Sequence, residues 1–436
     1  MSLGFIEMSI KSYLRKHLPY SFILWTHKVR AILANLIYGF PAKRLKIIGV
    51  TGTNGKTTTC NLIAKILEKA GYKVGLLTTI NFKIGEKEWE NLTKMTTISP
   101  FLLQKTLKQM ADAKCQYVVL ETTSHAIMQY RVWGIKFWGA VLTNITHEHL
   151  DYHKTFEDYQ KTKLQLFSQK PQLAIINGDD KSAQLFIDQS AGKLLTYGIE
   201  KRSDIMAKKI MLEPSGSLFT AVTPTSQISL NLKLPGKFNI YNTLAALSVG
   251  VALNVDPWQM KKALEEVEAI PGRMEKVDVG QKFLVIVDYA HTPDALQNIF
   301  ETLQIGKKGK IISVLGACGD RDKTKRPILG ALAGRYADYV IVTNEDPYTE
   351  DPWKIIQEVA AGVPRGADRR TPKIEGTNFW KLLDRGEAIA KALSLAEYRD
   401  IVLITGKGAE KWMVVGEKKV PWSDQETVKK ILTQRR

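Results

Sequence analysis

Cysteine is scarce in this sequence of 436 residues. The three cysteines, Cys60, Cys115 and Cys318, are odd in number and lie far apart along the chain. This usage argues against a disulfide framework and against a cysteine-rich zinc ribbon, because both need several suitably spaced cysteines. The sequence therefore predicts a reducing, cytoplasmic setting.

A long uninterrupted hydrophobic run is also missing. The most apolar early window, residues 19–40, carries His27, Lys28 and Arg30, and charges are costly in hydrocarbon. Glu7 and scattered basic residues interrupt the start of the chain, and no small-residue cleavage site follows. We therefore expect neither a membrane-spanning helix nor a cleaved signal peptide.

Acidic residues are too few to balance the basic ones. The 62 lysines and arginines exceed the 44 aspartates and glutamates, which gives a net charge of +18. This excess indicates phosphate-bearing or otherwise anionic partners. Nucleic acid is one candidate, but no recognisable nucleic-acid-binding module accompanies the charge, so we expect no nucleic-acid partner.

The basic excess is concentrated in the first 46 residues, which hold eight lysines and arginines against one acidic residue, Glu7. Bulky apolar residues recur there at roughly helical spacing. One interpretation is a helical pair packed on the next domain. The other is a basic amphipathic element in peripheral contact with an anionic membrane surface.

From Leu45 onward, short apolar runs alternate with turns and amphipathic stretches, a pattern typical of a parallel sheet flanked by helices. We predict an α/β fold in which a short basic helical N-terminal segment (1–44) precedes a P-loop-type central parallel-sheet domain (45–272) and a C-terminal Rossmann-like domain (273–436). The Pro-Gly-Arg triplet at 271–273 marks the boundary. The buried strands that we expect are 45–51, 74–79, 117–121, 139–144, 173–177, 283–290, 311–316, 339–344 and 401–406.

A glycine-rich turn lies between the first of these strands and a helix. It reads Gly52-Thr53-Asn54-Gly55-Lys56-Thr57-Thr58-Thr59. Backbone N–H groups of such a turn converge on phosphate oxygens, the lysine neutralises phosphate charge, and the next hydroxyl can ligate Mg²⁺. The turn therefore predicts a nucleotide-binding site.

Two polar clusters follow other predicted strands. The first, residues 121–131, joins a carboxylate to a Ser-His pair and an arginine, which suits a metal and an anionic, amide-rich substrate. The second, residues 144–153, is dense in histidine and acid, with Lys163 on the next helix. Taken alone, it fits a zinc site, a Mg²⁺ site shared with nucleotide phosphates, or a solvated loop.

Ordered motifs over residues 45–436 resemble the ATP-dependent Mur ligases, which build the stem peptides of peptidoglycan. The resemblance is greatest to the branch that joins the third amino acid to UDP-N-acetylmuramoyl-L-alanyl-D-glutamate. The motifs are GVTGTNGKTTT (49–59), LETTSHAIMQYRV (120–132), TNITHEHLDYH (143–153), YQKTK (159–163), LPGKFNIYN (234–242), PGRME (271–275), VDYAHTPDAL (287–296), GDRDKTKRP (319–327) and TGKGAE (405–410).

The resemblance implies roles for residues that match the family's motifs. The catalytic residues would be Lys56, His149 and Lys163, with Lys163 carbamylated. The Mg²⁺ ligands would be Thr57, Glu121, His149 and carbamylated Lys163. The ATP site would comprise Gly52, Thr53, Asn54, Gly55, Lys56, Thr57, Thr58, Asn242, Asp288, His291 and Arg321. The muramoyl peptide would contact Thr96, Thr97, Ser124, His125, Gln129 and Arg131, and the incoming amino acid would contact Glu345, Asp346, Tyr348, Gly406 and Glu410.

The reaction that the resemblance implies has two steps. The acceptor carboxylate attacks the γ-phosphate of ATP to give an acyl phosphate, and the amine of the amino acid then displaces phosphate. The expected partners are a muramoyl-peptide acceptor and an amino acid, and we expect a monomer. Only 44 residues precede the predicted strand at 45–51, so the acceptor's carrier stays open between UDP, a different nucleotide, a lipid and none.

Tyr348 stands where diaminopimelate-adding members carry an arginine that grips the distal carboxylate. A phenol does not replace a bidentate carboxylate clamp. Lysine, ornithine or another diamino acid is therefore a candidate, and we expect poor use of diaminopimelate. A ligase resembling folylpolyglutamate synthetase and a non-catalytic ATP-binding scaffold are the alternative functions.

Overall fold

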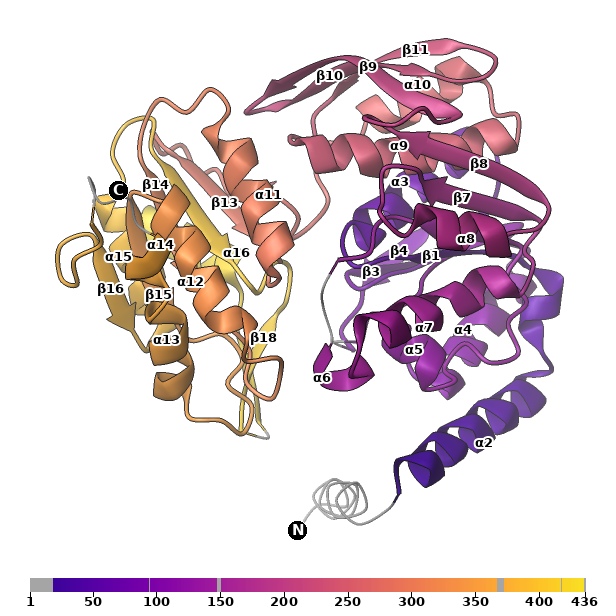
Figure 1. Ribbon diagram of the computed structural model, residues 1–436, viewed down its shortest axis with the longest axis horizontal. Coiled ribbons are helices and arrows are strands. Elements are labelled where there is room, and N and C mark those ends of the chain that lie inside the picture. Colours follow the sequence, from indigo (N-terminus) through magenta and orange to yellow (C-terminus); the bar gives the residue numbers. More distant parts are fainter. Residues whose placement is uncertain (1–18, 94, 147–149, 367–371, 417, 435–436) are drawn as a thin grey trace.

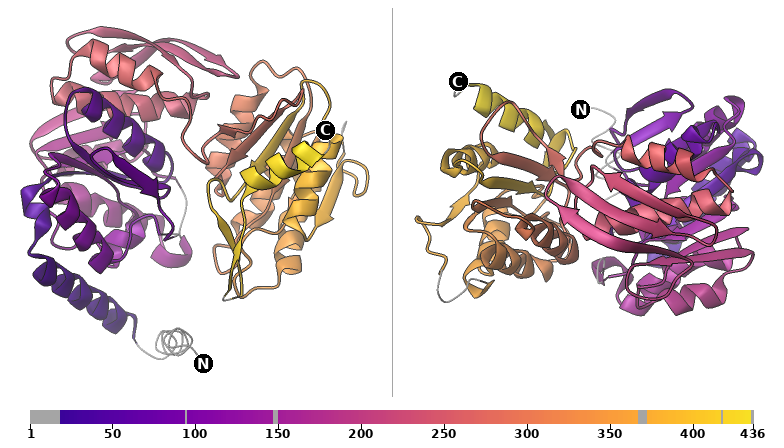
Figure 2. Two further views of the ribbon diagram at one scale, coloured as in Figure 1. Left: turned by 180° about the vertical axis from the view of Figure 1, so that it is seen from behind. Right: turned by 90° about the horizontal axis from the view of Figure 1, so that it is seen from above.

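The computed structural model describes residues 19–93, 95–146, 150–366, 372–416 and 418–434 (Figure 1). These residues form two α/β units, each built on a mainly parallel sheet, and helix α2 (Tyr20–Tyr38) extends from the first unit. Figure 2 shows the two units from behind and from above, with the long antiparallel strands at one end of the first unit. The predicted α/β architecture is confirmed.

The first unit contains an eleven-stranded sheet in the order β11-β10-β9-β8-β7-β6-β1-β5-β2-β3-β4. Its centre, from β8 to β2, is parallel, while β9-β10-β11 and β2-β3-β4 are antiparallel extensions. The strands are β1 (Lys46–Thr51), β2 (Val74–Leu77), β3 (Asn81–Ile84), β4 (Lys87–Glu90), β5 (Tyr117–Glu121), β6 (Gly139–Leu142), β7 (Leu173–Asn177), β8 (Lys193–Gly198), β9 (Ile205–Glu213), β10 (Gly216–Val222) and β11 (Gln227–Leu232).

Helices cover both faces of this sheet, because each helix has one apolar stripe to bury. Helices α3 (Lys56–Lys69), α9 (Lys237–Ala252) and α10 (Pro257–Glu265) pack on one face. The other face is covered by α4 (Pro100–Asp112), α5 (Ser124–Met128), α7 (Phe156–Ser168) and α8 (Ala183–Gln189). The short helix α6 (Leu150–His153) precedes α7, and a 3-10 turn, η1 (Pro41–Arg44), joins α2 to β1.

The second unit is a six-stranded sheet in the order β12-β13-β17-β14-β15-β16, parallel apart from β12. Its strands are β12 (Glu275–Lys276), β13 (Leu284–Asp288), β14 (Ile311–Leu315), β15 (Tyr339–Thr343), β16 (Phe379–Leu382) and β17 (Ile401–Thr405), with a separate hairpin of β18 (Trp412–Val415) and β19 (Lys418–Pro421). One face carries α11 (Pro293–Gln304), α12 (Lys325–Tyr336), α13 (Pro352–Ala360) and α14 (Val363–Gly366), and the other carries α15 (Arg385–Leu395) and α16 (Asp424–Gln434).

Two strands of the first sheet end earlier than the sequence predicts. Strand β6 ends at Leu142 rather than at residue 144, because Thr143 donates to the Asn54 carbonyl and the Asn144 side chain accepts from the Asn54 N–H. Strand β2 ends at Leu77 because the Thr78 hydroxyl caps the following turn. In both places, polar side chains after the last strand residue form hydrogen bonds with a neighbouring loop or turn.

Within the N-terminal segment, the structure describes helix α2 and the 3-10 turn η1. Among the described residues, no helix is both long enough and apolar enough to cross a membrane.

Candidate functional site

The phosphate loop connects β1 to α3 at the carboxyl edge of the first sheet. Gly52 has φ +149°, and a side chain there would collide with the Thr143 hydroxyl. Gly55 caps α3 with φ +81°, where only a glycine fits beside Asn242. Lys56 Nζ donates to the carbonyls of Gly52 (3.0 Å) and Thr53 (2.7 Å). The loop is thus closed over the ammonium that would neutralise a phosphate.

A buried carboxylate lies beside the first turn of α3. Glu121 ends β5, and its two oxygens accept from the Thr57 hydroxyl at 3.1 and 3.0 Å. The Thr79 N–H and hydroxyl both donate to the same carboxylate, at 2.8 and 2.9 Å. Arg273 Nη2, which comes from the start of the second unit, donates to the Thr57 hydroxyl at 3.2 Å. One carboxylate and one hydroxyl therefore face the position of a phosphate-bound cation.

Lys163 approaches the phosphate loop from α7. Its Nζ donates to the Gly52 carbonyl at 2.8 Å and lies 4.6 Å from the centre of the Tyr159 ring. The side chain is 1% exposed. Burial and the neighbouring Lys56 ammonium hold the pKa of Lys163 well below its usual range, which favours the neutral amine. His149, the other ligand implied by the resemblance, lies outside the described residues.

The predicted acceptor residues form a connected polar network after β5. Arg131 donates to the Thr97 carbonyl at 2.7 Å and to the Gln129 side chain, and Gln129 donates to the Tyr152 hydroxyl at 3.0 Å. The Thr97 hydroxyl donates to the Glu121 carbonyl at 2.9 Å, which joins this network to the phosphate loop.

The histidines in this region belong to the same network. His153 Nε2 lies 2.9 Å from the Ser124 hydroxyl, and the His125 ring lies against the Tyr152 ring with centroids 4.2 Å apart. Burial lowers the pKa of His125 to about 3, so the ring is neutral at physiological pH. The Thr96 hydroxyl accepts from Thr79 at 3.0 Å.

Residues from α9 and the second unit complete the nucleotide side. The Asn242 side chain contacts the phosphate loop at Gly55 and accepts from Thr59 at 3.3 Å. The Asp288 carboxylate accepts from two backbone N–H groups, those of Met274 and Ala290, both at 2.6 Å. His291 Nδ1 lies 2.9 Å from the Tyr289 carbonyl. Burial lowers the His291 pKa to about 3.

Most of these side chains line one cavity of about 1090 Å³ that reaches both units. Gly52, Ser124 and Lys163 are predicted site residues that are not on its wall. The predicted residues that line the cavity are Thr53, Asn54, Gly55, Lys56, Thr57, Thr58, Thr96, Thr97, Glu121, His125, Gln129, Arg131, Asn242, Asp288, His291, Arg321, Glu345, Asp346, Tyr348, Gly406 and Glu410.

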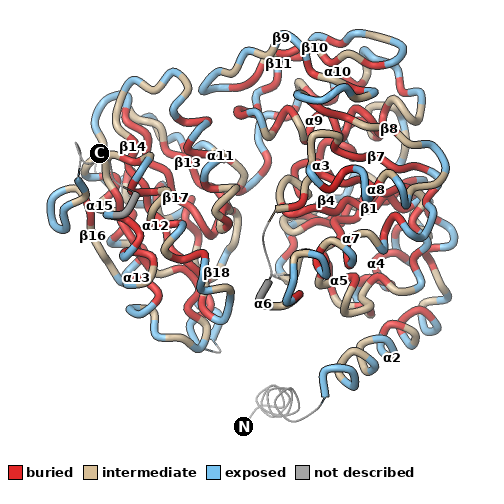
Figure 3. The backbone as a smooth tube through the Cα atoms, in the orientation of Figure 1, coloured by how far each residue is buried: buried red, intermediate tan, exposed pale blue. Residues whose placement is uncertain are grey.

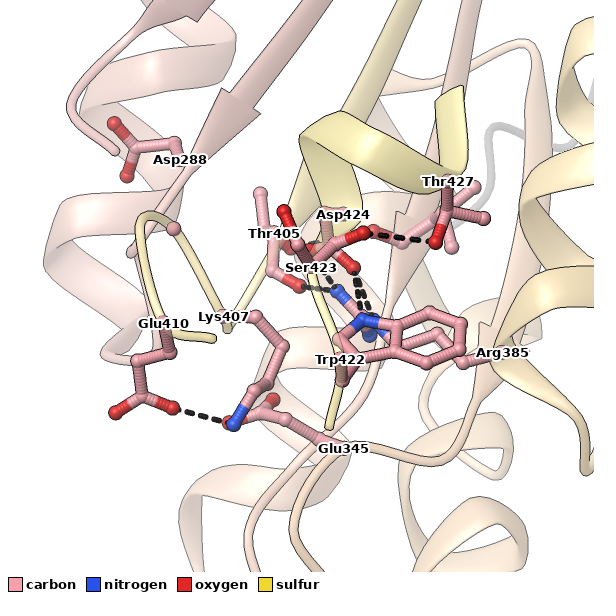
Figure 4. Close-up of polar contacts among 12 residues, drawn as sticks. Asp288, Glu345, Arg385, Thr405, Lys407, Glu410, Trp422, Ser423, Asp424 and Thr427 are labelled. Carbon is pink, nitrogen blue, oxygen red and sulfur yellow. Dashed lines mark hydrogen bonds and ion pairs between the residues drawn. The ribbon is translucent and has the colours of Figure 1, made fainter. Parts of the chain in front are cut away.

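Carboxylates dominate the end of the cavity formed by the second unit. Lys407 Nζ pairs with Asp346 at 2.9 Å and also with Glu410, as Figure 4 shows for the latter pair. Glu345 Oε1 accepts from the Cys318 thiol at 2.9 Å. Its second oxygen, Oε2, is buried and has no hydrogen-bond partner among the described residues. Gly406 leaves room for it, because a Cβ there would lie 2.3 Å from that oxygen.

Some residues at the site were not predicted. Arg273 belongs to the boundary triplet and to the PGRME motif, but no site role was predicted for it; it donates to Thr57 and lies 4.5 Å from the Tyr289 ring centre. Asp294 accepts from the Asn54 side chain at 2.7 Å and so joins the phosphate loop to α11. Asp294 lies within a motif that resembles the Mur ligases, and that motif is the signal that could have found it.

Two family models match the chain. The Mur ligase middle domain matches residues 50–250, and the Mur ligase glutamate ligase domain matches residues 272–408. The "UDP-N-acetylmuramoyl-L-alanyl-D-glutamate--2,6-diaminopimelate ligase" of Geobacillus thermodenitrificans is 39% identical over 441 residues, which cover 99% of this chain and 88% of the relative. The ligase of the same name from Bacillus cereus is 40% identical, over 94% of this chain and 82% of the relative.

Solved structures are similar as well. A structure of a ligase of the same name superposes with a TM-score of 0.62 at 31% identity, covering 90% of this chain and 79% of that one. A folylpolyglutamate synthase from Mycobacterium tuberculosis superposes with a TM-score of 0.70 over 87% of this chain and 92% of its own. At 18% identity, that second likeness shows the fold alone.

Proposed function

The chain belongs to the Mur ligase family, and we propose that it adds the third amino acid of a stem peptide to UDP-N-acetylmuramoyl-L-alanyl-D-glutamate. It is an ATP-dependent ligase that forms an amide bond between an acid and an amino acid. The observation that carries the proposal is the convergence of Thr57, Glu121 and Lys163 on one phosphate loop, beside the Arg131 network. The acceptor is proposed from the activity for which the similar ligases of Geobacillus thermodenitrificans and Bacillus cereus are named.

In this proposal, the phosphate loop holds the ATP. Backbone N–H groups of residues 52–57 and the dipole of α3 attract the phosphates. Lys56, which donates to two loop carbonyls, would turn its ammonium to the β- and γ-phosphates. Asn242, Asp288, His291 and Arg321 would surround the rest of the nucleotide.

Mg²⁺ fits the oxygens beside the loop. Magnesium prefers oxygen ligands, keeps several waters and is commonly held by one or two carboxylates together with phosphate oxygens. The Thr57 hydroxyl and the Glu121 carboxylate, already 3.0 Å apart, provide such a set, and His149 is the further ligand that the family motif implies. When bound, the ion neutralises charge that develops on the transferring phosphoryl group.

We propose that Lys163 is carbamylated. A neutral amine is the form that reacts with carbon dioxide, with loss of a proton, and the buried position of Lys163 lowers its pKa and so favours that form. The carbamate would carry a negative charge and two oxygens beside the phosphate loop, where Lys163 contacts Gly52. A bare ammonium there would repel Mg²⁺, whereas a carbamate would attract it.

The Arg131 network would hold the muramoyl peptide with its terminal carboxylate directed at the phosphate loop. The carboxylate attacks the γ-phosphorus and ADP leaves, which gives an acyl phosphate. The amine of the amino acid then attacks the acyl carbon and phosphate leaves. The residues accelerate these steps mainly by positioning the reactants and neutralising charge.

The second unit, which we propose spans residues 273–436, would bind the amino acid. Three carboxyl groups, Glu345, Asp346 and Glu410, line this end of the cavity, and the Lys407 ammonium pairs with two of them. The Arg321 guanidinium also lines the cavity, 5.7 Å from the centre of the Tyr348 ring. The buried Oε2 of Glu345 is an acceptor for a side-chain ammonium. Tyr348 has no positive charge to offer a second carboxylate. We therefore propose lysine, or a diamino acid of similar charge, as the amino acid.

The experiment that tests the function is phosphate release from ATP with UDP-N-acetylmuramoyl-L-alanyl-D-glutamate and a panel of amino acids. We expect release only when acceptor and amino acid are both present, with lysine or ornithine used better than diaminopimelate. ATP binding without turnover for any pair would contradict the ligase proposal and favour the scaffold. Efficient turnover of diaminopimelate would contradict only the amino-acid proposal.

Tyr348→Arg is expected to shift preference toward diaminopimelate by about 10- to 100-fold, because hydrogen bonds to a charged group contribute roughly 1.5–3 kcal/mol. The measurement is the ratio of kcat/KM for diaminopimelate to that for lysine. Tyr348→Phe is the matched control, since it removes the hydroxyl without adding charge, and it should keep the original ratio. If the Tyr348→Arg variant keeps the original ratio of kcat/KM values, residue 348 does not bind the distal carboxylate of diaminopimelate.

We propose that the protein acts as a monomer in the cytoplasm, and that its N-terminal segment makes peripheral contact with a membrane surface.

A further inference from the structure

Helix α2 has one face that packs firmly on the first unit. Ala31, Ala34 and Asn35 are buried, and the helix lies against α4. The Asn35 side chain donates to the Ala31 carbonyl at 2.9 Å and to the Trp133 carbonyl at 3.0 Å. This face fixes the orientation of the whole helix.

The opposite face is apolar and exposed. Of the eighteen large hydrophobic residues exposed in the described chain, six lie on this helix of 19 residues, including Trp25 at 59% and Ile37 at 66% exposure. Figure 3 shows α2 as mostly exposed or intermediate, with its buried part near the C-terminal end. At 3.6 residues per turn, five of the six form one stripe away from the buried face. The stripe comprises Phe22, Trp25, Leu33, Leu36 and Ile37.

The charges that α2 and η1 carry have one sign. Lys28 and Arg30 are exposed and flank the stripe, and Lys43 and Arg44 follow in η1. No aspartate or glutamate occurs between Glu7 and Glu68 in the sequence. Arg44 pairs with Asp112 of α4 at 2.8 Å, so Lys28 and Arg30 are the basic groups beside the stripe that would meet an anionic surface.

These features together match a helix that lies in a lipid interface. Such helices place tryptophan, phenylalanine and leucine on one side and are rich in lysine and arginine. Lys28 and Arg30 at mid-helix argue against a spanning orientation. We propose that the outer face of α2 docks on an anionic lipid bilayer, with the stripe at the acyl boundary and the flanking basic groups at the lipid phosphates.

The docked helix would also border the reaction cavity. Tyr20, Ile23, Leu24 and His27 of α2 line that cavity, at the side where Tyr20 lies against Tyr152 with ring centroids 6.4 Å apart. Docking would therefore hold the acceptor side of the cavity beside the lipid surface. This inference deepens the membrane contact proposed above, but the docking itself does not depend on which acceptor or amino acid is used.

The test is sedimentation of the full chain with vesicles of phosphatidylcholine containing phosphatidylglycerol, compared with pure phosphatidylcholine. We expect binding to the anionic vesicles that weakens with salt. The double variant Trp25→Ser, Leu36→Ser should bind at least about tenfold more weakly, because each side chain loses its burial in the acyl boundary. Lys28→Glu with Arg30→Glu should lose the preference for anionic lipid.

The matched control is Trp258→Ser on α10, which removes an equally exposed tryptophan (63%) from another surface and should leave binding unchanged. Thermal unfolding of each variant checks that the fold is kept. Three results would overturn the proposal: no binding of the unaltered chain, binding that the α2 variants do not change, or self-association in sedimentation velocity that depends on Trp25 and Leu36. Because the assay needs no turnover, failure of docking is distinguishable from failure of the ligase proposal.

Discussion

Lys163→Ala is expected to lower ligase turnover by about 10²–10³-fold, the loss typical of removing one preorganised electrostatic group from an active site. The side chain is buried, points at the Gly52 carbonyl, and is the group proposed to carry the carbamate. Without it, the phosphate loop and the Glu121 carboxylate would hold the metal and the transferring phosphoryl group with one negative charge fewer. The measurement is phosphate release under single-turnover and steady-state conditions.

The matched control is Lys161→Ala, because Lys161 lies on the same helix two residues away and is exposed. It should keep full activity. If Lys163 had a purely structural role, the Lys163→Ala variant would lose activity in proportion to its loss of stability. Small carboxylates would then not restore the activity. Recovery of the Lys163→Ala variant by added formate or acetate would support the carbamate, since these ions can enter the vacated space.

Isotopically labelled bicarbonate gives a direct readout of the modification. Because burial lowers the pKa of Lys163, a larger share of its amine is neutral at a given pH than in an exposed lysine, which favours carbamate formation. A labelled carbamate signal in the unaltered chain, absent from Lys163→Ala, is the expected result. An unmodified Lys163 in fully active protein would contradict the proposal.

The sequence predicted which polar residues would meet at the phosphate loop, for a local reason. Gly52–Thr58 follow one short apolar run and Glu121 ends another, and parallel strands end at one edge of a sheet, so their polar residues meet there. The order of apolar and polar residues along each strand and the turn after it is enough to predict that these polar residues lie close together. In the C-terminal half, Asp288 ends β13 and Glu345 lies two residues after β15, and their roles were predicted from the resemblance to the Mur ligases.

Contacts between distant segments could not be predicted in this way. Asn54 bonds Asp294 across 240 positions, and Arg273 bonds Thr57 across 216. Neither contact leaves a periodic pattern in the sequence, because each depends on how the two units are oriented. Lys407 was overlooked for a related reason: its role appears only once Asp346 and Glu410 are seen on either side of its ammonium.

Arg385 is the clearest residue of this kind, because arginine is rarely fully buried and none of the motifs in the sequence includes Arg385. Its guanidinium makes a two-pronged contact with the Asp424 carboxylate at 2.8 and 2.7 Å, and both side chains are 0% exposed (Figure 4). It also donates to the carbonyls of Asn344 and Thr405. Asn344 directly follows β15 and Thr405 ends β17, so the two carbonyls lie directly before Glu345 and Gly406, and the pair fixes two loops of the proposed amino-acid pocket.

Arg385→Leu is therefore expected to destabilise the fold by about 3–5 kcal/mol, since it leaves the Asp424 carboxylate buried without its counter-charge. The double variant Arg385→Leu, Asp424→Leu should recover much of that loss, because no uncompensated charge remains. Arg44→Leu, which breaks an exposed pair with Asp112, is the matched control and should cost about 1 kcal/mol or less. The measurement is urea unfolding, compared through midpoints at constant slope. If Arg385→Leu and Arg44→Leu cost the same, the buried pair does not hold the second unit together, and the pocket loops must be ordered by the Lys407 cluster instead.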